Sequence, residues 1–599
     1  MNSMTPDRGR LFGRHNWPIL ITGGLVVLLL ALRSGDIFAG TLPDNDDMMR
    51  MQQVRDLMAG QNWFNVDQSR FLTPEGGQMH WSRLPDLFLS AVIFVTRPFI
   101  GQAHAESLAA VMWPLGLLTV LLASLTLVMR RLNIGTAGQI AGLVFFSLSA
   151  AVYNFWPGRI DHHNLVVVLT VIGLAATLSP RSSARSAIIA AACITAMLSV
   201  AVESLPYVGA LILSFGLIWI VRGHRESSRL AVFGIALSGF AALFYLLDAP
   251  GIGMRRAVCD AYGTSHLAGL VGGGVILAAL GALGGGLDNW LKRLIAGAVS
   301  GIVILALVVW VNPACLGDPY ASVSEQVKLA WLSAVGEARS LPTVWASEPA
   351  RIVWQFGFIA AGLVACAIMM ATAAEGRRVA CAILGLMVVL SALATVWQIR
   401  GVTFSHVFAA IAGGWLFGVL FERWWAQRGA GPVLMLALGA LLVSPTSWRM
   451  LSTPFEKPSI TSADGRGYGV TCRDPEAYIA IRDHEIMDIF TPIDLGTSVL
   501  LRTPHRIFAG PYHRNVQGID LVTDVFMGSP DTARAKIEAM GADHVLYCRG
   551  LIETVRYAKL RPEGFAAQLE AGLIPAWLTP VDAQTETDGV ARLYKVATE

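Results

Sequence analysis

Charged residues are scarce in this chain of 599 residues. Asp, Glu, Lys and Arg make up 15% of the sequence, hydrophobic residues make up 54%, and the mean hydropathy is +0.55. This balance excludes an ordinary soluble globular protein. The sequence also lacks a glycine-rich phosphate loop, a nucleic-acid-binding signature, zinc-finger spacing and internal repeats. What remains is a polytopic membrane protein.

Apolar segments recur from about residue 17 to about residue 445. Short basic connections separate them, and the positive-inside rule places these connections in the cytoplasm. The first segment has no small-residue cleavage site, so we expect an uncleaved span. The prediction is about thirteen spans, with the N-terminus inside. They lie at about 17–33, 107–129, 136–155, 164–179, 186–203, 206–221, 229–247, 266–285, 293–311, 352–372, 378–396, 404–421 and 430–445.

The composition changes after residue 445. Residues 529–548 resemble a capped helix followed by a strand, as in mixed α/β domains. The predicted fold class is therefore an α-helical polytopic membrane protein with a C-terminal α/β extracytoplasmic domain. Residues 1–445 would form the transmembrane domain, with outer loops at 34–106 and 312–351, and residues 446–599 the second domain. Within the first loop, residues 85–100 predict an interfacial or re-entrant helix.

Seven cysteines are present, and three of them lie inside predicted spans. The other four lie in outer loops and in the C-terminal region, where an oxidising compartment favours pairing. We therefore predict two disulfides, Cys259–Cys315 and Cys472–Cys548.

Three aspartates, Asp44, Asp46 and Asp47, follow the first predicted span in "TLPDNDDMM". A helix start explains one or two of them, as an N-cap and as first-turn acids that complement the helix dipole. It explains three less well. The alternative is a divalent-metal or acid/base site, in which several carboxylates converge.

A second cluster, "GRIDHHN", precedes a later span and contains Arg159, Asp161, His162 and His163. Asp161 is suited to cap the following helix. Two imidazoles at a helix start oppose the dipole unless they are neutral or liganded, which favours a binding role. Arg159 would offset the negative charge or contact an anionic substrate. The predicted topology places both clusters on the same outer face.

Other charged residues lie at predicted outer positions. Glu325 ends "SVSE" (residues 322–325), which is also a capping box. Glu337 in "VGEARS" is either a site carboxylate or a solvated helix residue. Arg400, at the outer end of a span, is suited to pair with a phosphate or a carboxylate, and interfacial snorkelling is the alternative. His513 and Arg514 in "GPYHRN" would contact the acceptor or the donor phosphate, or else belong to a solvated turn.

Two of these motifs resemble those of the oligosaccharyltransferase catalytic-subunit family, a group of GT-C glycosyltransferases. "NDDMMRMQQVRDLMAG" (residues 45–60) is similar to the family's "NDGYxxAxxARDMIAG", and "GRIDHHNLVVVL" (residues 158–169) to its "GxxDxDxLxxxL". The resemblance implies thirteen spans, a catalytic aspartate at Asp46 and a metal held with Asp161 and His163. It also implies a metal-reaching glutamate at Glu325 and a donor-phosphate contact at Arg400.

The chain departs from this family at two places. The family's "WWDYG", which binds the hydroxyl of the acceptor sequon, is represented at best by "PIDLG" (residues 492–496), with Asp494 at its aspartate. Both tryptophans are missing, which implies an acceptor other than a sequon asparagine. His163 stands where the family has an acid, and imidazole favours Mn²⁺ or another transition ion over Mg²⁺.

The prediction is transfer of a sugar or oligosaccharide from a polyprenyl-phosphate- or diphosphate-linked donor to an acceptor at the periplasmic face of a bacterial inner membrane. A divalent metal, Mn²⁺ or Mg²⁺, would assist the reaction. A lipid-linked sugar flippase and a non-catalytic assembly partner are the alternatives. The residues predicted to act in catalysis, metal binding or donor binding are Asp46, Asp161, His163, Glu325, Arg400 and Arg159. Those predicted to serve the acceptor or another role are Asp47, His162, Glu337, Asp494, His513 and Arg514.

Overall fold

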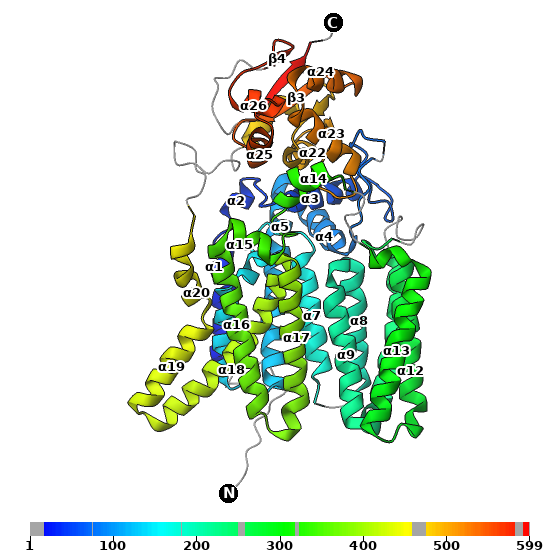
Figure 1. The fold of residues 1–599 in the computed structure, drawn as a ribbon, viewed down its shortest axis with the longest axis vertical. Helices are drawn as coiled ribbons and strands as arrows, with labels where there is room; N and C mark the ends of the chain where they lie inside the picture. The colour runs from blue at the N-terminus through cyan, green and yellow to red at the C-terminus, as the bar shows by residue number, and fades with distance from the viewer. Residues whose placement is uncertain are drawn as a thin grey trace.

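A computed structural model describes residues 17–74, 76–180, 183–248, 258–317, 323–457, 472, 475–581 and 591–597. A layer of roughly parallel helices carries a smaller domain at one end (Figure 1). We call the end of the helices that faces the smaller domain the domain-side end.

An apolar helix occupies each of the thirteen predicted segments. These helices are α1 (Trp17–Ala31), α5 (Gln102–Arg131), α6 (Thr136–Ser147), α7 (His163–Thr177), α8 (Ala184–Val200), α9 (Leu205–Arg222), α10 (Ser227–Asp248), α12 (Thr264–Leu283), α13 (Trp290–Val311), α16 (Pro349–Thr372), α17 (Arg378–Trp397), α18 (Val402–Gln427) and α19 (Ala430–Val443).

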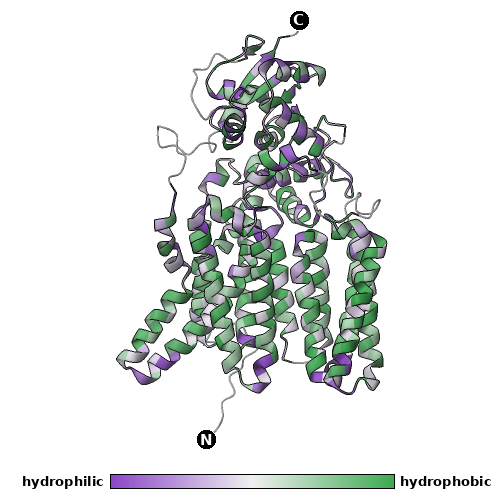
Figure 2. Ribbon diagram, in the orientation of Figure 1, coloured by the Kyte–Doolittle hydropathy of each residue, from purple (hydrophilic) through white to green (hydrophobic). Residues whose placement is uncertain are grey.

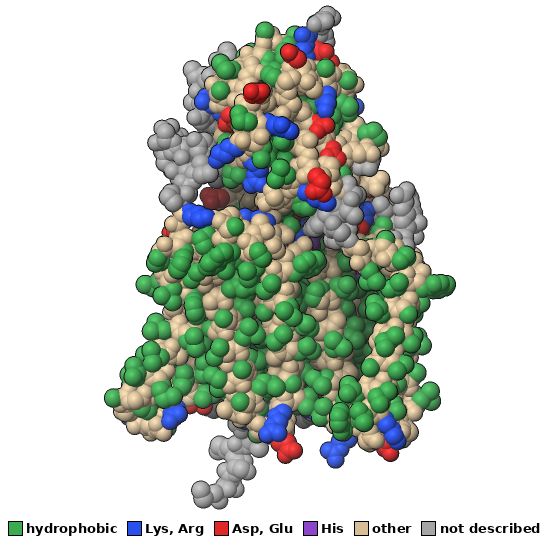
Figure 3. Space-filling view, in the orientation of Figure 1, with side chains coloured by type: hydrophobic (Ala, Val, Ile, Leu, Met, Phe, Trp, Pro, Cys, Tyr) green, Lys and Arg blue, Asp and Glu red, His purple; other side chains and the backbone are tan. Residues whose placement is uncertain are grey.

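Length and composition qualify seven helical segments of the described residues as membrane spans, or eight if the bent pair of α19 and α20 (Pro445–Ser452) counts as one. One of the seven joins α9 to α10, and four shorter apolar helices, α1, α6, α7 and α8, come in addition. The helices are mostly hydrophobic along their length (Figure 2). On the face that Figure 3 shows, hydrophobic side chains cover the helices and charged side chains gather at the two ends. This arrangement satisfies the backbone inside each helix and leaves apolar side chains for the lipid.

Helices α6 and α18 pack backbone against backbone. A Cβ atom added at Gly414 would lie 2.6 Å from the carbonyl oxygen of Gly138, so a larger residue cannot be accommodated there without a shift. Such close approach through small residues is typical of membrane helix pairs. It fixes α18, whose start follows the turn η9 (Ile399–Gly401) that carries Arg400.

Short helices cover the domain-side end. They are α2 (Gly35–Phe38), α3 (Asn45–Met58), α4 (Leu84–Ile100), α14 (Glu325–Ala330) and α15 (Leu341–Ser347). Helix α4 corresponds to the predicted helix at 85–100 and does not qualify as a span among the described residues. It packs at the domain-side end near α3 and α5 (Figure 1).

The smaller domain is a mixed α/β unit, as predicted. Its five strands lie in the order β2-β1-β3-β5-β4, with β2, β1 and β3 parallel and β5 antiparallel to both neighbours. The strands are β1 (Asp488–Phe490), β2 (Arg506–Ile507), β3 (His544–Cys548), β4 (Leu578–Pro580) and β5 (Ala591–Val596). The helices are α21 (Ile479–Arg482), α22 (Gly496–Arg502), α23 (Val516–Met527), α24 (Pro530–Ala539), α25 (Ile552–Leu560) and α26 (Phe565–Glu570).

One disulfide lies within the helical part of the molecule and one within the C-terminal domain, and polar links join the two parts. Both predicted disulfides are confirmed: Cys259 is bonded to Cys315, and Cys472 to Cys548. Arg70, between α3 and α4, donates to the carbonyl oxygens of Leu500 (2.6 Å) and Thr503 (2.8 Å). The segment that carries the first aspartates is therefore held against the α/β domain.

Candidate functional site

The first aspartate motif begins helix α3. Asp44 is the N-cap, since its Oδ1 accepts the backbone N–H of Asp46 at 3.3 Å, and its Oδ2 accepts from Arg159 at 2.8 Å. Asp47 is fully buried, and its Oδ1 accepts the N–H groups of Ile160 (2.8 Å) and Asp161 (3.1 Å). Capping and anchoring thus account for two of the three aspartates, and Asp47 joins α3 to the loop before α7.

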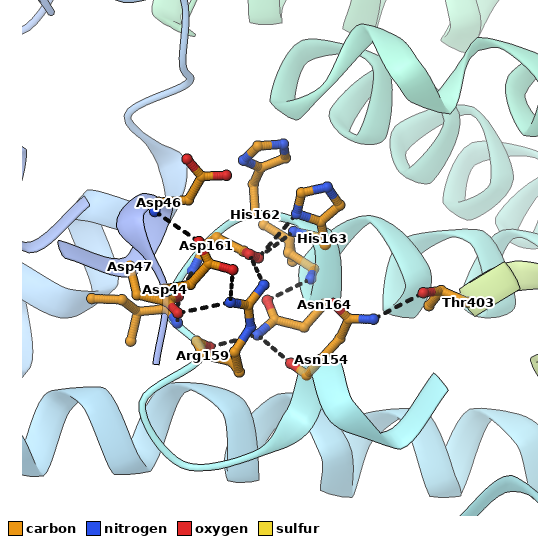
Figure 4. Close-up of polar contacts among 12 residues, drawn as sticks. Asp44, Asp46, Asp47, Asn154, Arg159, Asp161, His162, His163, Asn164 and Thr403 are labelled. Atoms are coloured by element: carbon orange, nitrogen blue, oxygen red, sulfur yellow. Dashed lines mark hydrogen bonds and ion pairs between the residues drawn. The ribbon is translucent and has the colours of Figure 1, made fainter. Parts of the chain in front are cut away.

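Arg159 lies beneath these acids rather than at the surface. Its guanidinium contacts Asp44, Asp47 (2.9 Å) and Asp161 (2.5 Å), and the residue is 1% exposed (Figure 4). Its Nη1 and Nη2 atoms point to protein carboxylates. The sequence predicted that Arg159 is either a counter-ion or a contact for the donor phosphate. In the structure its side chain is a buried counter-ion of three aspartates.

Asp46 differs from its neighbours because its carboxylate makes no hydrogen bond or ion pair with any described residue. Burial raises the pKa of Asp46 to about 8, and the carboxylates of Asp44 and Asp161 add to the shift. Glu337 acts in the same direction, and His163 opposes it. Negative charge around Asp46 therefore exceeds the positive charge that the protein supplies.

Asp161 and the two histidines begin helix α7. The Oδ1 atom of Asp161 accepts the backbone N–H of His163 at 2.9 Å and lies 3.2 Å from its ring Nδ1. Burial alone would raise the pKa of Asp161, but Arg159 and His163 outweigh it and hold that pKa well below its ordinary value. The imidazoles of His162 and His163 are stacked with centroids 4.5 Å apart. Burial lowers the pKa of His162 to about 3, which keeps it neutral.

Two glutamates reach His163 from other parts of the chain. Glu203, in the turn η3 (Val202–Ser204), has its Oε1 atom 3.0 Å from Nε2 of His163, and Glu337 has its Oε2 atom 3.9 Å away. The other oxygen of Glu203 accepts from Arg400 at 2.6 Å. No motif pointed to Glu203. We call Asp46, Asp161, His163 and Glu337 the acidic cluster.

Glu325 lies elsewhere in this structure. Its side chain is 90% exposed and pairs with Lys328 at 2.9 Å. Ser324 is the N-cap of α14, and its hydroxyl contacts Asp520 of the α/β domain. Ser322, the predicted capping serine, lies outside the described residues. The structure thus brings Glu337, and not Glu325, to the acidic cluster, because α14 docks on the α/β domain.

Asp494 lies close to the start of α3. Its Oδ1 atom accepts from the side-chain amide of Asn45 at 3.3 Å, while its backbone N–H donates to Glu553 at 2.8 Å. The "PIDLG" segment therefore stands beside the residue that precedes Asp46.

His513 and Arg514 lie in a turn, and both side chains contact Asp260. Together with His80 and Asp260 they form a second cluster, which we call the Asp260 cluster. Arg514 donates to both Asp260 oxygens at 2.7 Å, and His513 lies 2.8 Å from one of them. Trp81 packs between this cluster and the acidic one, with its ring centroids 6.4 Å from His80 and 5.9 Å from His162.

Both regions contain ligand types that suit a metal ion. Ligand atoms of His162, His163 and Glu203 lie within 4.8 Å of one another, and so do those of His80, Asp260 and His513. In the Asp260 cluster the guanidinium of Arg514 already occupies the carboxylate and would repel a cation. In the acidic cluster Arg159 likewise holds Asp161, but the carboxylate of Asp46 has no partner among the described residues and suits a cation.

Comparison with known proteins identifies the fold. No protein-family model matches the sequence, and no curated protein matches it. Among solved structures, the oligosaccharyltransferase AglB of Archaeoglobus fulgidus, in complex with an inhibitory peptide and a dolichol-phosphate, is similar over 91% of this chain and 72% of its own. The TM-score is 0.66 and the sequence identity 14%.

Two further structures of the Archaeoglobus fulgidus oligosaccharyltransferase share this similarity, each at 14% identity. One is tethered to an acceptor peptide that contains the NVT sequon, with a TM-score of 0.64 over 91% of this chain and 72% of that one. The other is a complex with Zn and sulfate, with a TM-score of 0.60 over 87% of this chain and 68% of that one. The chain therefore has the GT-C fold predicted from its motifs.

Proposed function

We propose that this protein is a membrane glycosyltransferase that transfers a sugar or an oligosaccharide from a polyprenyl-phosphate- or diphosphate-linked donor to an acceptor on the periplasmic side. The observation that carries the proposal is the acidic cluster. It combines an unpartnered carboxylate, Asp46, with Asp161, His163 and Glu337 at the domain-side end of a GT-C fold. Charge of this kind, close to an arginine, suits displacement of an anionic leaving group.

The acidic cluster offers ligand types that suit a divalent ion, and the ring nitrogen of His163 lies within 4.8 Å of ligand atoms of His162 and Glu203. Carboxylate oxygens of Asp46, Asp161 and Glu337 and a ring nitrogen of His163 would hold it, and the imidazole favours Mn²⁺ or Zn²⁺ over Mg²⁺. Such an ion would neutralise charge that develops on the leaving phosphate. The solved oligosaccharyltransferase with Zn and sulfate supports an ion of this class on this fold.

The remaining residues have roles that follow from their positions. Arg400 would pair with phosphate oxygens of the donor, since guanidinium groups bind phosphate in a fork geometry. Asp46 would orient the acceptor nucleophile or accept its proton. Arg159 and Asp47 would act indirectly, because their hydrogen bonds hold α3 and the loop before α7 in place.

The acceptor would approach from the α/β domain. Asp494 beside Asn45 supports this direction. The chain lacks the two tryptophans that the resemblance associates with sequon binding, which supports an acceptor other than a sequon asparagine.

The test is transfer from a radiolabelled polyprenyl-linked sugar by purified protein with membrane-derived acceptors. Asp46→Asn and Asp161→Asn should abolish both product formation and donor consumption. Asp36→Asn, which changes an exposed aspartate in α2, is the matched control and should retain activity. Full activity in the Asp46 and Asp161 variants would refute the site. Donor translocation without consumption by the wild-type protein would instead support a flippase.

A further inference from the structure

Glu203 occupies a distinctive place beside the acidic cluster. It lies in the three-residue turn between α8 and α9, at the domain-side end of both helices. One carboxylate oxygen lies 3.0 Å from Nε2 of His163, and the other accepts from Nη1 of Arg400 at 2.6 Å. The carboxylate therefore stands directly between a residue of the acidic cluster and the arginine assigned to the donor phosphate.

Arg400 is held near the cluster by its backbone as well. Its N–H donates to the carbonyl oxygen of Glu337 at 3.2 Å, and the preceding residue, Ile399, donates to the carbonyl of Arg339 at 2.9 Å. The side chains of Arg400 and Glu203 remain partly exposed, at 28% and 24%. A ligand that reaches the cluster can therefore reach both side chains.

A carboxylate and a phosphate present the same kind of oxygen pair to a guanidinium. A donor phosphate that binds Arg400 beside His163 would meet the Glu203 carboxylate at contact distance, and two like charges at that distance repel each other strongly. A phosphate that takes the place of Glu203 on Nη1 of Arg400 therefore requires Glu203 to move aside.

We propose that Glu203 is a displaceable counter-ion that occupies the donor-phosphate position in the free protein. Glu203 is a positioning residue that keeps the side chains of Arg400 and His163 oriented in the free protein. The arriving phosphate displaces it from Arg400. When the lipid phosphate leaves, Glu203 pairs with Arg400 again. The inference rests on the proposed function, because that function assigns Arg400 to the donor. It follows that removing the charge of Glu203 tightens the binding of a lipid phosphate.

The test measures binding of undecaprenyl phosphate to the purified full-length protein by native mass spectrometry, as purified and after EDTA treatment. Glu203→Gln should bind about fivefold more tightly than the wild type, the factor that corresponds to an exposed ion pair of about 1 kcal/mol. In turnover the same variant should show a lower KM for the donor. Glu106→Gln is the matched control, because it removes a carboxylate from another arginine ion pair, with Arg55, at the same end of the helices. It should bind like the wild type.

Weaker or unchanged binding by Glu203→Gln would overturn the inference, because it would show that the carboxylate only supports Arg400. Arg400→Gln separates this result from a failure of the proposed function. If the wild type binds and Arg400→Gln does not, the donor assignment holds whatever Glu203→Gln does. If Arg400→Gln binds like the wild type, or no protein binds, the donor assignment fails and the inference with it. Glu203→Ala replaces the glutamine variant if that variant does not fold.

Discussion

The acidic cluster and the Asp260 cluster both combine carboxylates with imidazoles, and Trp81 contacts His80 of the second and His162 beside the first, yet their charge balance differs. Arg514 and His513 satisfy Asp260, and their hydrogen bonds hold the pKa of Asp260 well below its ordinary value although burial alone would raise it. Asp46 has no such partner, and its pKa rises to about 8. Histidines and carboxylates thus form a structural contact where the cations suffice, and a candidate binding site where they do not.

Removal of divalent metal should have the largest effect. We expect EDTA to reduce sugar transfer by about three orders of magnitude or more, because several kcal/mol of charge stabilisation would be lost, and Mn²⁺ to restore it. Mn²⁺ at a hundredfold excess over its Kd should stabilise the folded protein by about 3 kcal/mol, seen as a rise in Tm. This rise should vanish in Asp46→Asn and persist in His513→Ala. The reverse pattern would show that the metal binds at the Asp260 cluster and not at the acidic cluster.

The ion pairs of Arg159 and those of Arg514 should differ in their contribution to the free energy of unfolding. Arg159→Met leaves three acids without their shared cation, and we expect it to reduce the free energy of unfolding by about 3–5 kcal/mol. Arg514→Met leaves one partly exposed carboxylate that retains His513, so about 1–2 kcal/mol is expected. Thermal unfolding in detergent measures both. Equal losses would mean that Arg159 is not the central counter-ion.

Substitutions of Glu337 and Glu325 test which of the two glutamates belongs to the acidic cluster. Glu337→Gln should lower kcat/KM by about 10- to 100-fold, as expected for a group that supports a metal centre. Glu325→Gln should change it less than about twofold, because that side chain is exposed and pairs with Lys328. Steady-state transfer assays measure kcat/KM for both variants. A larger loss for Glu325 would mean that α14 leaves the α/β domain during the reaction.

The pH dependence of the Asp260 contact should be the smallest effect. A depressed pKa contributes stability that is present above the ordinary carboxyl pKa of about 4 and is lost as the pH falls below it. The difference in Tm between wild type and Asp260→Asn should therefore shrink as the pH falls below about 4. A difference that grows below about pH 4 would contradict this assignment.

Most of the fold could be predicted from the sequence. Apolar segments and basic connections predicted a helix at all thirteen positions, and the location of four cysteines predicted both disulfides. Hydropathy works here because a bilayer requires every backbone group to be satisfied within its own helix. The helix-capping and strand signals of residues 529–548 likewise predicted α24 and β3 in the α/β domain.

The site was accessible in part. Local motifs pointed to Asp46, Asp161 and His163, which lie in short segments where one motif brings its own residues together. The motifs did not show which of Glu337 and Glu325 belongs to the acidic cluster. Both residues lie in the predicted outer loop 312–351, and the position of Glu325 depends on where α14 docks. Glu203 carries no local signal, since its role comes from His163 and Arg400, which are distant in sequence.

By itself, the sequence determined that this chain forms apolar helices with a soluble domain after them, and that acids and imidazoles gather at the ends of particular helices. These are properties of short segments, decided by hydropathy and helix-end chemistry. Only the tertiary structure decided which charges are neutralised. It placed Arg159 under three aspartates, Arg514 on Asp260 and Glu203 on Arg400, and it left Asp46 without a partner among the described residues. Charge compensation depends on distance in space, and segments that are separated in the sequence supply much of it.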